Sequence, residues 1–168
     1  MSQAEHKAQA PAAVDCAIIT VSDTRTPDND VGGRTIRELL EGAGHRVLGA
    51  VIVRDDPQQV ATVIRQQLAD GKVRVVITTG GTGITARDDT FEAVDGLLEK
   101  RLDGFGELFR MLSYQAIGAA AMLSRACAGL ARGHIVIALP GSEPAVRLGM
   151  EKLVVPELAH MVQQARTR

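Results

Sequence analysis

The residues best able to do chemistry gather in one glycine-rich segment, residues 78–90. Three of the four residues at 80–83 are glycine, so main-chain N–H groups can turn toward a ligand and form a concave anion site. The segment has neither the lysine of a Walker P-loop nor the spacing of a dinucleotide fingerprint. The structural alternative is a tight strand-to-helix turn capped by Asp88 or Asp89. We expect one aspartate to cap the helix and the other to be free for a metal ion or a substrate group.

Two further polar segments follow predicted strands. Ser22 and Asp23 open a polar loop that is longer than most connections between a strand and a helix. The chain from Pro140 through Gly141 to Ser142 makes a second glycine turn, and Ser142 is expected to cap the last helix. Both segments could contact a ligand, and a solvated loop and a simple helix cap are the respective alternatives.

A second acidic pair, Asp55 and Asp56, stands between a predicted strand and Pro57. Helix capping is one interpretation of this pair, and a carboxylate that helps Asp88 hold magnesium is the other. Magnesium prefers one or two carboxylates plus substrate phosphates to a cage of protein ligands, and nucleotidyl transfer uses it in this way. The four histidines and two cysteines do not cluster, so we expect buried thiols and surface or hydrogen-bonded histidines.

The elements that must position these residues follow from the hydrophobic pattern. Short apolar runs predict strands at residues 14–21, 45–53, 73–79, 126–131 and 134–139. Amphipathic stretches predict helices at 33–44, 57–68, 89–98, 104–123 and 144–165, with an interruption near Ser113 and a bend or split at Pro156. This alternation predicts an α/β fold with a mostly parallel sheet and helices on both faces. Because ligands bind beyond the carboxyl ends of such strands, the three polar segments should meet there.

Composition narrows the class of protein. The chain has 168 residues, which suits one domain, predicted at residues 14–168 after a loose tail at 1–13. Aromatic residues make up only 2%, too few for the stacking platforms that bind single-stranded nucleic acid. The net charge of -1 lacks the excess of positive charge that is typical of proteins binding nucleic acid or a membrane surface. Without a membrane-spanning run or a secretory signal, the expected location is the cytoplasm.

The motifs together resemble a known family. Residues 79–83, followed by Arg87 and Asp88 and much later by residues 139–142, are similar to the MoaB/MogA family of molybdenum cofactor biosynthesis. The stretch at residues 104–114, together with Ser124 and Arg125, is similar to the MoaB branch in particular. The resemblance runs over residues 16–158, nearly the whole chain.

This resemblance implies a fold, a reaction and an assembly. The fold would be a three-layer α/β/α sandwich with a mostly parallel, mixed sheet. Family members bind molybdopterin, and the catalytic ones use Mg-ATP to adenylylate its terminal phosphate and release pyrophosphate. Members form homotrimers or homohexamers, and contacts with other enzymes of the pathway are expected. Asp55 and Asp88 would serve catalysis and hold Mg²⁺. The residues expected to bind substrate are Ser22, Asp23, Thr79, Gly80, Gly81, Thr82, Gly83, Ser113, Pro140, Gly141 and Ser142.

Three alternative functions share these features in part. A pterin-binding protein without catalytic activity would keep the glycine turns and differ only at the acidic pair. A nucleotide pyrophosphatase related to the CinA family would share the fold and an Asp-Asp pair such as Asp88-Asp89, but Thr82 and residues 104–110 fit it less well. A scaffold protein that uses the domain only for assembly is the third.

Overall fold

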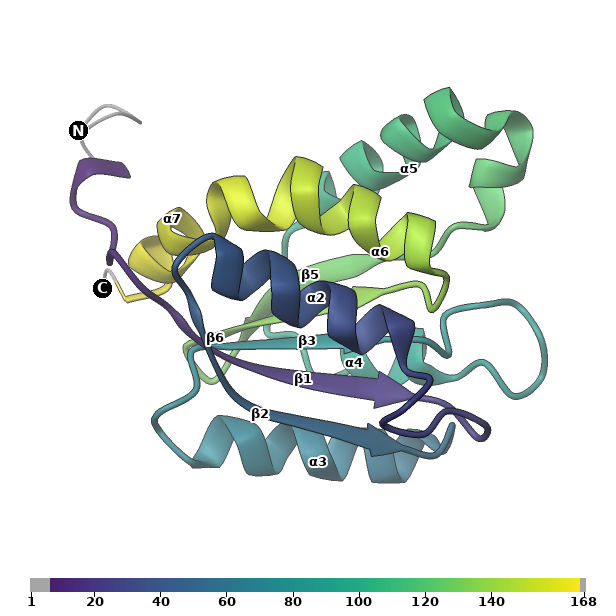
Figure 1. The fold of residues 1–168 in the computed structure, drawn as a ribbon, viewed down its shortest axis with the longest axis horizontal. Coiled ribbons are helices and arrows are strands. Elements are labelled where there is room, and N and C mark those ends of the chain that lie inside the picture. The colour runs from purple at the N-terminus through teal and green to yellow at the C-terminus, as the bar shows by residue number, and fades with distance from the viewer. Residues whose placement is uncertain (1–6, 167–168) are drawn as a thin grey trace.

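A six-stranded sheet lies between two layers of helices (Figure 1). The computed structural model describes residues 7–166. The strand order is β2-β1-β3-β6-β5-β4, and the four strands from β2 to β6 run parallel, whereas β5 and β4 are antiparallel to their neighbours. The strands are β1 (Asp15–Val21), β2 (Arg46–Val53), β3 (Val75–Thr79), β4 (Lys100–Arg101), β5 (Cys127–Ala131) and β6 (His134–Leu139).

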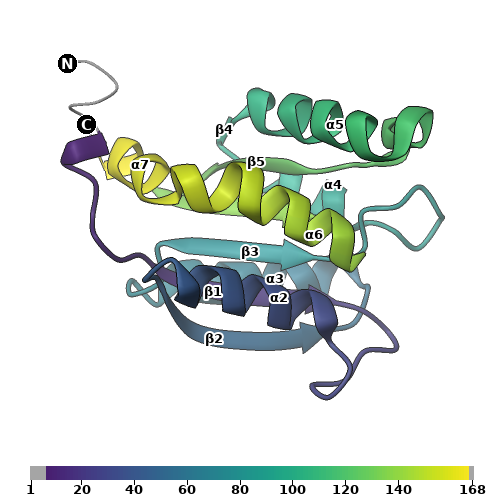
Figure 2. The ribbon, with the colours of Figure 1, turned by 45° about the horizontal axis from the view of Figure 1, so that its top comes forward.

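The helices cover both faces of the sheet, which confirms the predicted three-layer sandwich. They are α2 (Val31–Gly42), α3 (Pro57–Ala69), α4 (Thr90–Asp95), α5 (Asp103–Ile117), α6 (Glu143–Gly149) and α7 (Val155–Arg166). A 3-10 segment, η1 (Gly118–Leu123), follows α5, and a π segment, η2 (Met150–Val154), joins α6 to α7. Helices α2, α5, α6 and α7 pack on one face, and α3 and α4 on the other (Figure 2).

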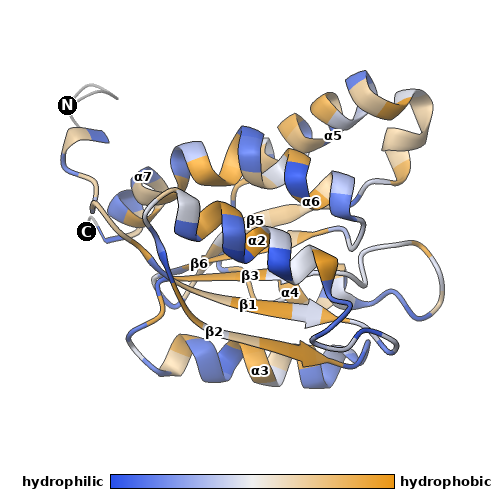
Figure 3. Ribbon diagram, viewed as in Figure 1, coloured by the Kyte–Doolittle hydropathy of each residue, from blue (hydrophilic) through white to orange (hydrophobic). Residues whose placement is uncertain are grey.

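The core is aliphatic on both sides of the sheet. Ile18 and Ile77 belong to the cluster under α2, α5 and α7, whereas their neighbours Ile19 and Val76 belong to the cluster under α3 and α4. Successive strand residues point to opposite faces, so a strand covered on both sides needs an unbroken apolar run. Figure 3 shows these central strands as predominantly hydrophobic. The same apolar runs are what made the strands predictable.

Of the two predicted helix interruptions, one is wrong and one is confirmed. The interruption near Ser113 is wrong, because α5 continues through Ser113, whose Oγ donates to the carbonyl oxygen of Phe109 at 2.8 Å. The helix ends instead at Gly118, whose φ of 67° is left-handed. The predicted bend or split at Pro156 is confirmed as a split: the π segment η2 separates α6 from α7 just before the proline, which cannot donate to the carbonyl oxygen four residues earlier.

Smaller differences concern the edges of the sheet. The predicted helix at 89–98 is shorter, ending at Asp95, and the two-residue strand β4 follows it. Strand β4 lacks any apolar pattern, since it consists of Lys100 and Arg101 paired with β5. A strand that depends only on a neighbour's main chain leaves no periodic signal in its own sequence.

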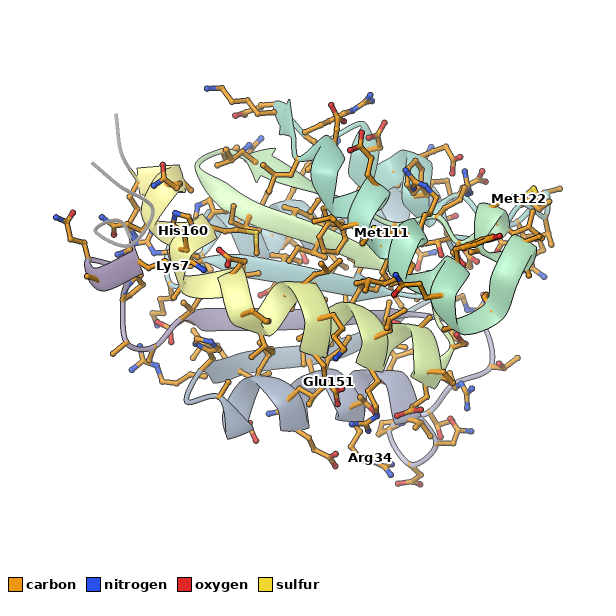
Figure 4. The ribbon with its side chains drawn as sticks, turned by 90° about the horizontal axis from the view of Figure 1, so that it is seen from above. Lys7, Arg34, Met111, Met122, Glu151 and His160 are labelled. Carbon is orange, nitrogen blue, oxygen red and sulfur yellow. The ribbon has the colours of Figure 1, made fainter. Side chains whose placement is uncertain are left out.

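The predicted tail at 1–13 falls partly outside the described residues, which begin at residue 7. Lys7 forms an ion pair with Glu157 of α7, so this end of the chain contacts the last helix. Figure 4 shows Lys7 and His160 close together there. Across residues 7–166, no helix combines the length and apolar character needed to cross a bilayer.

Candidate active site

The three predicted polar segments meet at the carboxyl edge of the parallel strands (Figure 1). They follow β1, β3 and β6, which are adjacent in the sheet. From β1 the chain passes to β2 on one side, and β3 lies on the other side, so the strand order reverses between β1 and β3. Ligands of open α/β sheets bind at such a reversal.

The first glycine turn fits only because two positions lack side chains. Gly80 has a φ of +97°, and a Cβ there would lie 2.2 Å from the carbonyl oxygen of Val21. The N–H of Gly80 donates to Leu139 at 3.1 Å, and a Cβ on Gly141 would lie 3.1 Å from the Cα of Gly80. The two glycine turns therefore stack main chain on main chain at the ends of β3 and β6.

The next two glycines leave space for carboxylates. A Cβ on Gly81 would lie 3.0 Å from an oxygen of Asp55, and a Cβ on Gly83 would lie 2.5 Å from an oxygen of Asp88. The structure thus brings the two predicted catalytic aspartates against the same glycine segment, although they are far apart in sequence. Asp23 joins them, because its carboxylate accepts from the main-chain N–H of Asp55 at 3.3 Å and pairs with Arg87.

The carboxyl group of Asp55 is electrostatically frustrated. Its pKa is raised, first by burial and then by the negative charges of Asp88 and Asp23. A hydrogen bond from Thr90, whose Oγ1 is 3.5 Å away, only partly offsets this. A cation at this position would favour the ionised carboxylate.

Only one residue of the two Asp-Asp pairs, Asp56, caps a helix with its side chain. Asp56 caps α3 by accepting from the N–H of Gln59 at 2.8 Å, which leaves Asp55 free of that task. The expected cap of α4 is wrong: Asp89 occupies the cap position, but its side chain makes no capping bond. Asp88 instead accepts from the N–H of Thr85 at 3.0 Å within its own loop.

The predicted cap at Ser142 is also wrong, although Ser142 stands at the cap position of α6. Its hydroxyl makes no capping bond, and only its carbonyl oxygen accepts, from Val146 at 3.0 Å. Pro144 sits in the first helical turn and has no N–H, which removes one of the usual partners of a capping side chain. Ser142 lines a cavity instead.

A cavity of about 420 Å³, called here the main cavity, opens over the glycine turns. That size lies within the range of small-molecule sites. Its floor is polar main chain, whereas α5, η1 and α6 supply apolar walls. Thr79 lies behind the floor and donates to Pro140 at 2.8 Å, and Ser22 and Asp23 line neighbouring hollows. The lining is Gly80, Gly81, Thr82, Gly83, Asp88, Ser113, Ala116, Ile117, Leu123, Ser124, Pro140, Gly141, Ser142, Pro144, Ala145 and Leu148.

Arg125 is one of the site residues that sequence reasoning missed. Its guanidinium donates to the carbonyl oxygens of Thr82 at 2.8 Å and Gly83 at 2.6 Å, so it holds the glycine segment from outside the cavity. Glu92 pairs with it, and the ring of Phe91 lies 4.8 Å beneath it. The signal was present in the Ser124-Arg125 pair of the family resemblance, to which no role was given.

The three histidines within residues 7–166 and both cysteines stand apart from the site. His45 and His134 are buried and bonded to the main chain of Val14 and Val73. Both thiols are buried, and burial raises the pKa of Cys16 and of Cys127 to about 12. The predicted buried thiols and hydrogen-bonded histidines are confirmed.

Comparison with known proteins decides the family. The sequence profile described as "Probable molybdopterin binding domain" matches residues 17–160. The chain belongs to this molybdopterin-binding family. The Bacillus cereus relative named "Molybdenum cofactor biosynthesis protein B" is 51% identical over 162 residues, which are 96% of each chain. The Bacillus subtilis protein of the same name is 47% identical over 167 residues, which are 99% of this chain and 98% of its own.

Solved structures agree with this membership. A crystal structure of molybdenum cofactor biosynthesis protein B is 48% identical, with a TM-score of 0.92 over 95% of this chain and 100% of its own. The tungsten cofactor synthesizing protein MoaB from Pyrococcus furiosus is 38% identical, with a TM-score of 0.84 over 94% of this chain and 100% of its own. The expected MoaB/MogA family and its fold are therefore confirmed, which places the chain among proteins of molybdenum cofactor biosynthesis. A CinA protein from Thermoplasma acidophilum, 20% identical with a TM-score of 0.56 over 88% of this chain and 98% of its own, shares the fold alone.

Proposed function

We propose that the chain binds molybdopterin in the main cavity and adenylylates its terminal phosphate with Mg-ATP, releasing pyrophosphate. One observation carries this proposal. The glycine segment forms the floor of a cavity of about 420 Å³ while two carboxylates, Asp55 and Asp88, lie directly against it. A site for binding alone needs the glycine turns, but it has no need of the crowded carboxylates.

The lining suits a flat, phosphorylated ring. Apolar side chains such as Ile117 and Leu148 offer walls for a bicyclic ring system. The glycine turns offer main-chain N–H groups, which form anion sites where successive groups point the same way. Ser142 adds a hydroxyl that no helix-capping bond occupies. The phosphate of the pterin would therefore lie on the floor, near Asp88.

The acidic residues fit magnesium better than a metal with a full protein cage. Within residues 7–166, no group of three or more histidine, cysteine and acidic side chains is arranged to hold a metal. Magnesium commonly binds through one or two carboxylates and the phosphates of its substrate. Asp55 and Asp88 would hold it, and the raised pKa of Asp55, caused first by burial and then by neighbouring carboxylates, supports a cation there. Bound magnesium would neutralise phosphate charge and align the reacting groups.

In this reaction the role of the protein is to position the reacting phosphates, and no side chain has to act as a nucleophile. An oxygen of the pterin phosphate attacks the α-phosphorus of ATP, and the bond from that phosphorus to the bridging oxygen breaks, so pyrophosphate leaves. The attacking oxygen is already ionised at neutral pH, so no general base is required. The glycine N–H groups hold the phosphate in line, and the apolar walls exclude water that would compete as a nucleophile.

Release of pyrophosphate tests the proposal. The protein, incubated with molybdopterin, ATP and Mg²⁺, should release pyrophosphate in step with adenylylated pterin. Asp88→Asn should abolish turnover while pterin affinity stays close to wild type. Asp89→Asn is the matched control. The side chain of Asp89 is next to Asp88 in the sequence but makes no capping bond, so its carboxylate should be dispensable.

Each other outcome has a defined meaning. Pterin binding without pyrophosphate would overturn the enzyme and leave a non-catalytic pterin-binding protein. Hydrolysis of ADP-ribose with no response to pterin would instead favour a CinA-like pyrophosphatase. Loss of turnover and affinity together in Asp88→Asn would mean that Asp88 only shapes its loop through Thr85.

We also propose that the chain assembles as a homotrimer or homohexamer through α5 and η1. Six large apolar side chains are exposed there. Apolar residues scattered singly over a surface are normal, but a group of this size is typical of an interaction site. Figure 4 shows Met111 and Met122 on this part of the molecule. The six, called here the α5 patch, are Leu108, Met111, Tyr114, Ile117, Met122 and Leu123.

A further inference from the structure

Residues 82–88 form a loop between the glycine turn and α4, called here the Asp88 loop. Inside it, the carboxylate of Asp88 accepts from both the N–H and the hydroxyl of Thr85, and the N–H of Asp88 donates to the carbonyl oxygen of Thr85 at 3.0 Å. One ion pair, between Arg87 and Asp23, ties the loop to the end of β1. The side chain of Arg87 is 76% exposed, and ion pairs in such surroundings contribute little. A stronger contact is therefore needed to fix the loop against the main cavity.

The side chain of Arg125 supplies that contact, because it binds both ends of the Asp88 loop. Its Nε donates to the carbonyl oxygen of Thr82 at 2.8 Å. One terminal nitrogen donates to the carbonyl oxygen of Gly83 at 2.6 Å and to that of Asp88 at 3.2 Å. Carbonyl oxygens from the first two residues of the loop and from its last residue thus converge on one planar group.

Arg125 is itself held firmly. Glu92 of α4 pairs with it, and the ring of Phe91 lies with its centroid 4.8 Å from the guanidinium carbon. The hydrogen bond from Arg125 is the largest cause of the lowered pKa of Glu92. Only a quarter of the side chain of Arg125 is exposed. A guanidinium group held between a carboxylate and an aromatic face has little freedom, so the places of the carbonyl oxygens that it binds are well defined.

Binding the carbonyl oxygens also sets the direction of an N–H group. In a trans peptide unit, the carbonyl oxygen of one residue and the N–H of the next point in opposite directions, and residues 7–166 contain no cis peptide bond. Because the carbonyl oxygen of Thr82 points to Arg125, the N–H of Gly83 points away from it, toward the cavity that Gly83 lines and Arg125 does not. Within residues 7–166 this N–H has no protein acceptor, so it is available to a phosphate oxygen.

The same contacts set the place of a carboxylate. A Cβ on Gly83 would lie 2.5 Å from Oδ2 of Asp88, so the carboxylate rests directly on the glycine whose carbonyl oxygen Arg125 binds. Arg125 also binds the carbonyl oxygen of Asp88 itself. Any shift of the Asp88 loop would therefore move the N–H donor and the carboxylate together.

We propose that Arg125 is a positioning residue for the reaction: from outside the main cavity, it directs the N–H of Gly83 toward the substrate phosphate and holds Asp88 beside it. This inference rests on the proposed function, since it takes the pterin phosphate to lie on the glycine floor. Lysine cannot replace arginine in this role. Its ammonium group carries all its donors on one atom, whereas the planar guanidinium group spreads them over three nitrogens and reaches the carbonyl oxygens and a carboxylate together.

Amide hydrogen exchange tests the position of the loop without any substrate. The N–H groups of Asp88 and Thr90 donate to Thr85 and Gly81, on either side of the loop. In Arg125→Lys both amides should exchange about tenfold faster than in the wild type, the effect of losing one charge-assisted contact on local opening.

Arg46→Lys is the matched control for this measurement. Arg46 also makes a two-pronged contact, with the carboxylate of Asp15, but at the amino ends of β1 and β2, away from the site. This variant should leave the exchange of both amides unchanged, and its kcat should equal that of the wild type.

Pyrophosphate release tests whether the position of the loop matters for the reaction. The kcat of Arg125→Lys, measured well below its melting temperature, should fall about a hundredfold, because a displacement of about 1 Å can cost that much. A loss of stability alone would lower the melting temperature and leave the kcat of the folded protein unchanged. Arg125→Ala leaves a gap between the carbonyl oxygens and Glu92, so guanidinium ions at millimolar concentration should raise its kcat severalfold, and ammonium ions should not.

Failure of this inference can be told from failure of the enzyme. Unchanged amide exchange in Arg125→Lys would overturn the role of Arg125, whatever the turnover. Faster exchange with a wild-type kcat would mean that Arg125 only stabilises the loop, and equal effects of the two ions would mean that its planar geometry is not needed, so either result would overturn the positioning role. 

A wild type that binds pterin without releasing pyrophosphate would overturn the reaction. Pterin affinity would then decide the role of Arg125: about tenfold weaker binding by Arg125→Lys would keep it as a residue that positions the binding site, and unchanged binding would overturn it. Circular dichroism of each variant checks that the fold is retained.

Discussion

At the scale of single residues, the glycine segment is shaped by what lies behind it. Gly81 has a φ of +66°, and a Cβ there would lie 2.1 Å from Oγ1 of Thr90 and 3.0 Å from the carboxylate of Asp55. The residue is therefore constrained both by its left-handed backbone and by two neighbouring side chains. These two costs can be separated, because Gly71 has nearly the same backbone and open space around it.

Gly81→Ala should lower the free energy of unfolding by about 3 kcal/mol, and Gly71→Ala by only about 1 kcal/mol. The left-handed conformation costs an alanine roughly 1–2 kcal/mol at either position. The remainder at Gly81 reflects the displacement of Thr90 and Asp55, which overpacking makes costly. Urea denaturation measures both variants. Equal losses would mean that the loop yields freely and that the carboxylate is not held by the glycine.

Residue types near the site could be predicted only where local chemistry marked them. Glycines and aspartates after a clear strand stand out, so Gly80, Asp55 and Asp88 were named from the sequence alone. Arg125 could not be found in this way, because its contacts with Thr82 and Gly83 span more than 40 residues of chain. An isolated arginine carries no local pattern that distinguishes a clamp from a solvated side chain.

At the scale of elements, α5 connects the core to the main cavity. Phe109 is fully buried on one side of the helix, while Ser113 and Ile117, one and two turns later, line the cavity. Its ring also packs closely on Gly149 of α6, where a Cβ would lie 3.2 Å from it. The contact of Phe109 with Gly149 therefore helps to position α5, together with the buried ring of Phe105.

Phe109→Ala should destabilise the fold by about 3–5 kcal/mol, the usual cost of emptying a buried phenylalanine site. It should also weaken pterin affinity, because α5 supplies a wall of the cavity. Glu107→Ala, an exposed position on the same helix outside the α5 patch, serves as the control and should change stability by less than about 0.5 kcal/mol. Thermal unfolding followed by circular dichroism gives both values. A loss below about 1 kcal/mol for Phe109→Ala would mean that α5 is held mainly by other contacts.

Helices and strands could be predicted where burial imposes a regular pattern of apolar residues. Elements without such a pattern could not be predicted. The strands β1, β3 and β6 are covered on both faces, so their apolar runs were plain in the sequence. The two-residue β4 and the π segment η2 depend on main-chain partners and on the effect of Pro156. The extension of α5 through Ser113 depended on a hydroxyl bonding back to Phe109, which no periodicity reveals.

At the scale of the whole molecule, the α5 patch is the surface best suited to self-association. Met111 is 50% exposed and Met122 is 74% exposed. Charged residues make up 23% of the chain, yet these two exposed positions carry apolar side chains. Ile117 and Leu123 belong both to the patch and to the cavity lining. An assembly through α5 would thus close one side of the cavity.

The double variant Met111→Lys, Met122→Lys should shift the chain from oligomer to monomer in size-exclusion chromatography with light scattering. Two charges buried in an apolar interface without partners cost far more than such contacts contribute. Leu48→Lys is the matched control, since Leu48 is 49% exposed on β2 at the opposite edge of the sheet. A monomeric wild type, or dissociation by Leu48→Lys instead, would contradict the assignment.

The exposed ring of Tyr114 has an optical consequence. The chain contains no tryptophan and a single tyrosine, so its ultraviolet emission comes from one position on α5. That ring lies one turn before Ile117, in the helix that walls the main cavity. A pterin ring bound in that cavity would lie close enough to quench this emission. The native protein therefore carries its own unlabelled reporter of whether the main cavity is occupied.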